Sequence, residues 1–128
     1  MTFLTTLAKP LSALVLFLGL SSTAAEAGEE TKPSRESMAW ELIAAGALVV
    51  DVRTEKEFAA GHLDGALNIP HDQTEQRLAE YGADKSQPIV VYCRSGRRSS
   101  AAESVLKKNG FTAVHNGGGY EGLMTAAH

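Results

Sequence analysis

Cys93 is the one cysteine of the sequence, and its neighbours are of types that make a thiol reactive. It ends the apolar run PIVVYC at residues 88–93, and an amphipathic stretch at 99–109 follows closely. Three arginines lie beside it, namely Arg94, Arg97 and Arg98. We predict a strand, a short loop and a helix start, where inward amides and the helix dipole bind an anion. Because a thiolate is itself an anion, the same features lower the pKa of the Cys93 thiol.

A lone cysteine is more often an inert, buried apolar residue, and the arginines decide between the two interpretations. A helix amino terminus favours acidic side chains, so arginines there reduce local stability. Three of them beside Cys93 therefore favour a functional site over a solvated helix start.

The length of the loop after Cys93 distinguishes two thiol chemistries. Tyrosine and dual-specificity phosphatases use Cys-x5-Arg, a loop long enough to surround a phosphoryl group. Here only four residues separate Cys93 from Arg98, and Ser99 occupies the position where such a phosphatase needs arginine. The shorter loop favours a smaller group on the sulfur, a persulfide. A phosphatase of the Cdc25-like kind or an arsenate reductase is the less favoured alternative, because the short loop counts against it.

The elements around this loop alternate between helical and strand patterns. Helices are predicted at 37–45, 54–61, 72–81 and 99–109, strands at 47–53, 65–70, 88–93 and 113–116, and a short last helix after the glycines at 117–119. Thr54 and Glu57 have the spacing of a capping box, and Asp72 is a candidate cap. The alternation predicts an α/β domain with a mainly parallel sheet of about five short strands and helices on both faces.

The amino-terminal segment has a different composition. Lys9, an apolar stretch at 11–20 and small residues ending in Ala27 are typical of a secretory signal peptide over residues 1–27. The apolar stretch is about half of the roughly 20 residues that span a bilayer, so we expect no permanent membrane anchor. Residues 28–36 are predicted to form a flexible arm, and residues 37–128 the domain. The formal net charge of −3 provides no basic field for nucleic acid.

Three segments, in order, carry a resemblance to a known family. CRSGRRS at 93–99 resembles the active-site loop of the rhodanese family of sulfurtransferases. DVRTEKEFAAGHLDGALNIP at 51–70 and NGGGYEGL at 116–123 resemble two further motifs of that family. The resemblance implies a rhodanese-like fold. In its size and predicted export, the sequence is similar to the small, single-domain periplasmic members of the family. A periplasmic location is therefore expected.

The resemblance also implies a reaction and a set of site residues. Cys93 would take the outer sulfur of thiosulfate as a persulfide and pass it to cyanide or a thiol acceptor. The backbone of Arg94, Ser95, Gly96, Arg97, Arg98 and Ser99 would surround the transferred sulfur. Arg94 and Arg97 would attract the anionic donor, and Arg98 is expected to pair with Asp51 as a brace for the loop.

Supporting roles are expected for Asp51, Arg53 and His62. Arg53 is predicted to form an ion pair with Glu55 or Glu57 at a strand end, and His62 to order a turn by hydrogen bonding. We expect no cofactor. No general base is required, because a thiolate is already deprotonated, and no metal is expected, because the histidines lack ligand spacing. A monomer is the default expectation. The remaining alternative is a non-catalytic or sulfur-carrying module of the same fold, and the absence of Cys-x-x-Cys argues against a thioredoxin-like oxidoreductase.

Overall fold

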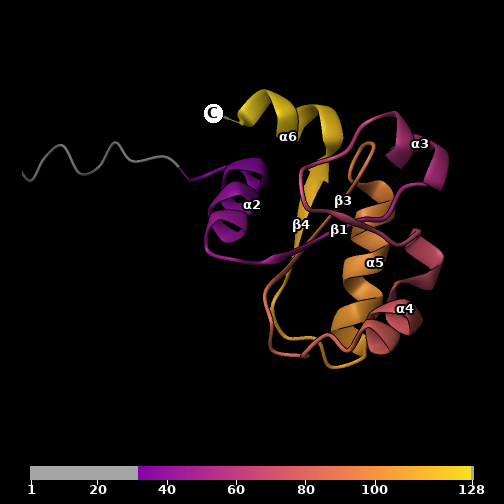
Figure 1. The fold of residues 1–128 in the computed structure, drawn as a ribbon. Helices are drawn as coiled ribbons and strands as arrows, with labels where there is room; N and C mark the ends of the chain where they lie inside the picture. The colour runs from indigo at the N-terminus through magenta and orange to yellow at the C-terminus, as the bar shows by residue number, and fades with distance from the viewer. Residues whose placement is uncertain (1–31, 128) are drawn as a thin grey trace, which may run out of the picture. The chain divides into compact units, whose positions relative to one another are not determined.

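The structure is a computed structural model that describes residues 32–127 (Figure 1). The domain is one compact unit that begins at Pro33. Its helices are α2 (Arg35–Ala44), α3 (Glu55–Ala60), α4 (Thr74–Tyr81), α5 (Arg97–Lys108) and α6 (Tyr120–Ala126), with the 3-10 helix η3 (His71–Gln73) before α4. Its strands are β1 (Leu48–Asp51), β2 (Leu67–Asn68), β3 (Ile89–Cys93) and β4 (Val114–Gly119). None of the helices in this part of the chain is long and apolar enough to cross a membrane.

The strands form one parallel sheet in the order β2-β1-β3-β4. The α/β prediction is confirmed, but the described residues form four strands and not about five. These four strands lie within or overlap the four predicted strand segments, and among residues 32–127 no fifth segment pairs with the sheet. Strand β4 is longer than predicted, because it continues through the glycines to Gly119 and leads directly into α6. The central strand β3 is buried along its whole length, as its continuous apolar sequence predicts.

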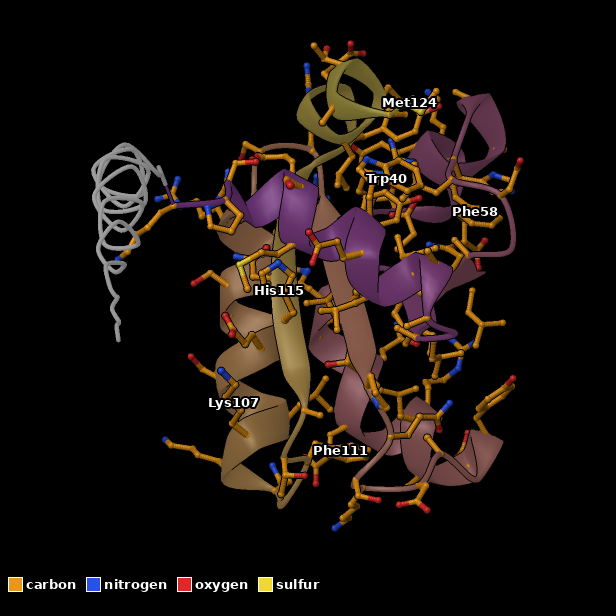
Figure 2. The ribbon with its side chains drawn as sticks, turned by 90° about the vertical axis from the view of Figure 1, so that its left-hand side faces the viewer. Trp40, Phe58, Lys107, Phe111, His115 and Met124 are labelled. Carbon is orange, nitrogen blue, oxygen red and sulfur yellow. The ribbon has the colours of Figure 1, made fainter. Side chains whose placement is uncertain are left out.

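Each face of the sheet is covered by helices, with α2 and α6 on one face and α4 and α5 on the other (Figure 1). Successive residues of a strand point to opposite faces, so β3 contributes to two cores. Val90 and Tyr92 pack with Ala39 and Leu123, whereas Val91 and Cys93 pack under α5. Figure 2 shows Trp40 of α2 next to α6, where its indole N–H donates to the Leu123 carbonyl at 2.9 Å. The thiol of Cys93 therefore belongs to the α5 side of the sheet.

Local signals position most helix ends. Thr54 and Glu57 form the predicted capping box of α3, and Gly82 ends α4 in the left-handed conformation. The prediction that Asp72 caps the next helix is wrong, because Asp72 lies within η3 and α4 begins at Thr74. Helix α5 begins at Arg97, two residues before the predicted start.

Candidate functional site

Cys93 is the last residue of β3 and is fully buried. In the parallel sheet the carboxyl ends of all strands lie at the same end of the sheet. There Asp51 of β1 pairs with Tyr92, and Gly119 of β4 pairs with Cys93. Open α/β sheets bind ligands at this end. The thiol thus lies where the fold places functional groups.

The loop after Cys93 folds back over the sulfur. Gly96 has a φ of 96°, a left-handed conformation that favours glycine, and it is the residue immediately before α5. Its backbone N–H donates to Cys93 Sγ at 2.9 Å. Helix α5 starts at the next residue, so the positive end of the helix dipole is adjacent to the sulfur.

The pKa of the Cys93 thiol reflects two opposing effects. Burial raises the pKa, whereas the Ser99 hydroxyl and the backbone amides of Ser99, Ser95 and Gly96 lower it. The hydrogen bonds prevail, and the pKa falls below the usual value of 9.0. The site therefore favours the thiolate, the nucleophilic form of cysteine.

Asn116 is a site residue that the sequence analysis did not identify. Its Oδ1 accepts from the Ser99 hydroxyl at 2.7 Å and from the Gly118 N–H at 2.9 Å, and its Nδ2 donates to the Gly96 carbonyl at 3.2 Å. A bulge in β4 follows it, since Val91 pairs with Asn116 but Tyr92 pairs with Gly118. A polar residue near the carboxyl end of a strand, followed by glycines, is the signal that could have identified it.

The expected pair of Arg98 with Asp51 is wrong. Both oxygens of Asp51 are taken by Arg53, whose Nη2 lies 2.6 Å from Oδ2 and whose Nε lies 2.9 Å from Oδ1. Arg98 instead donates to Glu57 of α3, at 3.0 and 3.2 Å. The expected pairing of Arg53 with a glutamate is wrong for the same reason. The physical cause is reach, because Arg53 lies only two residues beyond Asp51 at the end of β1.

A hollow of about 290 Å³ opens beside the cysteine loop. Its lining residues are Arg53, Glu57, Ala60, Arg94, Tyr120 and Glu121. Arg53 and Glu57 are neutralised by the ion pairs described above, whereas no hydrogen bond or salt bridge engages the Arg94 or Glu121 side chain within residues 32–127. Arg97 is exposed at the start of α5. Within the described residues, the hollow beside the cysteine loop thus holds one unengaged positive side chain, Arg94, and one unengaged negative side chain, Glu121.

His62 lies outside this hollow. Its Nδ1 is 2.9 Å from the Phe58 carbonyl, and its ring stacks on that of Phe58, which Figure 2 labels on α3. This is the turn-ordering hydrogen bond that the sequence predicts. Across residues 32–127 no group of three or more His, Cys, Asp or Glu side chains could hold a metal ion.

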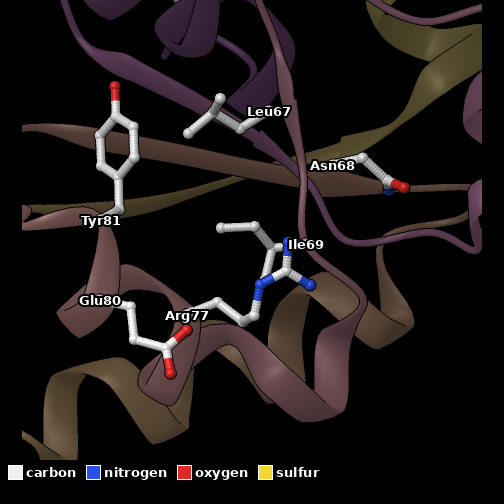
Figure 3. Close-up of a pocket in the computed structure, with 6 residues that line it drawn as sticks. All are labelled: Leu67, Asn68, Ile69, Arg77, Glu80 and Tyr81. Atoms are coloured by element: carbon white, nitrogen blue, oxygen red, sulfur yellow. The ribbon is translucent and has the colours of Figure 1, made fainter.

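A second hollow, of about 310 Å³, lies between β2 and α4 (Figure 3). Figure 3 shows Arg77, Glu80 and Tyr81 around it, together with Leu67, Asn68 and Ile69. Arg77 bonds to Gln73 and Glu80 accepts from Gln76, so both charged side chains are engaged along α4. This hollow does not include Cys93 among its lining residues.

Fold and site together define a class: a parallel α/β domain with Cys93 at the end of a central strand, where a short loop and a helix start lower the pKa of its thiol. The chain belongs to the rhodanese-like domain family, whose model matches residues 36–126.

Two similar proteins and one solved structure illustrate the family. Thiosulfate sulfurtransferase PspE of Escherichia coli (strain K12) is 36% identical over 74 residues, which cover 58% of this chain and 71% of the relative. Thiosulfate sulfurtransferase 16, chloroplastic, of Arabidopsis thaliana is 38% identical over 121 residues, covering 79% of this chain and 99% of the relative. The solved structure of the human single-domain sulfurtransferase TSTD1 superposes with a TM-score of 0.60 at 30% identity, covering 69% of this chain and 90% of that one.

Proposed function

We propose that this protein is a thiosulfate sulfurtransferase in which Cys93 carries the transferred sulfur. The observation that carries the proposal is the Gly96 N–H at 2.9 Å from Cys93 Sγ, at the start of α5. A thiolate held by an amide and a helix dipole is a nucleophile that remains charged in a buried site. The names of the relatives PspE and thiosulfate sulfurtransferase 16 support thiosulfate as the donor.

The reaction has two displacement steps. In the first, the Cys93 thiolate attacks the outer sulfur of thiosulfate, a new S–S bond forms, and the S–S bond of thiosulfate breaks with both electrons leaving on sulfite. In the second, cyanide or a thiolate attacks the outer sulfur of the persulfide, and the electron pair of the broken bond regenerates the Cys93 thiolate. No cofactor or external oxidant enters either step, and the kinetics are ping-pong.

The other residues of the site stabilise charge, attract the donor or hold the loop in position. The amides of Ser95, Gly96 and Ser99 stabilise negative charge on the sulfur. Arg94 in the hollow and Arg97 at its exposed position attract the anionic donor. Arg98 ties the start of α5 to α3 through Glu57, and the pair Asp51–Arg53 fixes the end of β1. His62 orders the turn after α3.

We also propose export, with residues 1–27 as a cleaved signal peptide, residues 28–36 as an arm and a periplasmic monomer as the product. The signal segment lies outside the described residues, and the sequence pattern alone supports this part of the proposal. Amino-terminal sequencing of the secreted protein tests it, with Gly28 as the expected first residue. Light scattering of the purified protein tests the monomer.

Thiocyanate release from thiosulfate and cyanide tests the activity. The purified protein is expected to turn over, and to gain one sulfur atom by intact mass when thiosulfate is supplied alone. Cys93→Ser should abolish both results while leaving the circular dichroism spectrum unchanged. If the wild type neither turns over nor gains sulfur, the domain is a non-catalytic module. Faster hydrolysis of a phosphate ester than sulfur transfer would favour a phosphatase.

A further inference from the structure

The Ser99 hydroxyl has one hydrogen and two acceptors within reach. Its Oγ lies 2.7 Å from Asn116 Oδ1 and 3.5 Å from Cys93 Sγ. A hydroxyl donates a single hydrogen bond, so Ser99 cannot serve both acceptors at once. When Cys93 is a neutral thiol, the amide oxygen at 2.7 Å is the better acceptor. When the sulfur is charged, it competes for the hydrogen, because bonds to ionised acceptors are stronger.

Asn116 holds the hydroxyl oxygen in this shared position. Ser99 is fully buried in the first turn of α5. A serine within a helix ordinarily bonds back to the carbonyl three or four residues earlier, here that of Gly96 or Ser95. Asn116 competes with this local alternative, because Oδ1 accepts from Ser99 and Nδ2 occupies an acceptor position of the Gly96 carbonyl.

The remaining bond of Asn116 fixes its own orientation. Gly118 N–H donates to Oδ1 at 2.9 Å across the β4 bulge. The amide is therefore anchored on β4 and reaches across to the cysteine loop. If the hydroxyl hydrogen turns toward the sulfur by rotation about the Cβ–Oγ bond, the oxygen stays in place and Asn116 keeps its bonds to Gly118 and Gly96.

We propose that Asn116 is a positioning residue that keeps the Ser99 hydroxyl within reach of the sulfur on Cys93, so that its hydrogen passes from the amide to the sulfur when the sulfur becomes charged. The consequence for sulfur transfer rests on the proposed function, since the charged species it serves are the thiolate and the persulfide. The effect on the pKa of the free Cys93 thiol is independent of the proposed function.

Several charged groups surround the loop, and all are unchanged when Asn116 is replaced. They are Arg94, Arg97 and Arg98 of the loop and α5, Glu57 of α3, Asp51 and Arg53 at the end of β1, Arg35 and Glu36 of α2, Glu121 of α6 and His115 of β4. Because Asn116 is uncharged, its substitution alters hydrogen bonding at the loop without changing the net charge.

The pH dependence of Cys93 alkylation by iodoacetamide tests the inference. Asn116→Ala should raise the alkylation midpoint by about one pH unit, a roughly tenfold smaller thiolate fraction below that midpoint, because Ser99 turns to its own helix. Ser99→Ala should raise the midpoint similarly without altering β4. In the double variant the two shifts should not add, since both remove the same hydrogen bond.

Asn109→Ala is the matched control, because within residues 32–127 the Asn109 side chain bonds only to the Val105 carbonyl, at the far end of α5. It should leave the midpoint unchanged. An unchanged or lowered midpoint in Asn116→Ala, fully additive shifts, or an equal shift in Asn109→Ala would each overturn the inference. Sulfur uptake from thiosulfate is measured on the same samples. A wild type that takes up no sulfur contradicts the proposed function alone, whereas normal uptake with an unmoved midpoint contradicts the inference alone.

Discussion

Two guanidinium nitrogens of Arg98, in α5, donate to the Glu57 carboxylate of α3 at 3.0 and 3.2 Å. This ion pair joins the start of α5 to α3. Glu57 also accepts from the Thr54 backbone N–H at 3.0 Å as part of the capping box of α3. The Glu57 carboxylate thus caps the start of α3 and also braces the loop after Cys93. The side chains of Arg98 and Glu57 are 29% and 27% exposed, so solvent screens this pair only in part.

The pH dependence of this pair is a first prediction. The hydrogen bond from Arg98 lowers the pKa of Glu57 from 4.5 to about 2. A depressed folded-state pKa gives stability that is present above about 4.5 and is lost as the pH falls toward about 2. Glu57→Gln should therefore lower the free energy of unfolding by about 1 kcal/mol at neutral pH. Urea titrations should show this difference shrinking as the pH falls from 4.5 toward 2.

Glu103→Gln is the control for that measurement. Glu103 pairs with Lys107 on the outer face of α5, and Lys107, labelled in Figure 2, is 52% exposed. Loss of the Glu103–Lys107 ion pair should change the free energy of unfolding by less than about 0.5 kcal/mol. Equal effects of the two substitutions would contradict a bracing role for Glu57.

A second prediction concerns Gly119, where β4 passes against the cysteine loop. A Cβ at this position would collide with the carbonyl oxygen of Arg94. Gly119→Ala should displace the loop and lower kcat/KM for thiosulfate by roughly 100-fold, the cost of a misplacement of about 1 Å. Gly122→Ala, in α6, meets only Glu36 at 3.4 Å and should retain activity. Similar kinetics for both variants would show that the close approach is unimportant.

How much the sequence predicts depends on the range of the interactions involved. Strand β3 and the capping box of Thr54 follow from local patterns, and both are present. The partner of Arg98 depends on which carboxylate another side chain has already taken, and Asp51 is taken by Arg53. The separation of two residues between Asp51 and Arg53 is visible in the sequence, whereas the approach of Glu57 to Arg98, 41 residues away, is created by the fold. Asn116 was missed because its role requires the β4 bulge, which pairing with β3 creates.

A third prediction concerns the attraction of the donor. Arg94 lines the hollow and makes no ion pair within the described residues. Arg94→Glu should raise KM for thiosulfate by about tenfold at low salt, with less effect on kcat, and the difference should shrink as salt screens the charge. Arg77→Glu on α4, at the other hollow, makes the same charge change and should leave KM unaltered. A KM that rises equally in both variants would indicate a general effect of net charge.

A fourth prediction concerns the buried pair at the end of β1. Asp51 is fully buried and Arg53 is 6% exposed, and the Arg53 guanidinium also lies 4.6 Å from the centroid of the Tyr120 ring and donates to the Gly61 carbonyl at 2.7 Å. Arg53→Ala removes the positive charge beside the buried Asp51 carboxylate and leaves it the backbone N–H of residue 53 at 2.9 Å, so the free energy of unfolding should fall by about 3–5 kcal/mol. Arg53→Ala combined with Asp51→Asn should recover part of that loss, because no uncompensated charge remains. Urea unfolding at neutral pH measures both variants, and a double variant no more stable than Arg53→Ala alone would mean that the packing of Arg53 on Tyr120, and not its charge, stabilises the edge of the sheet.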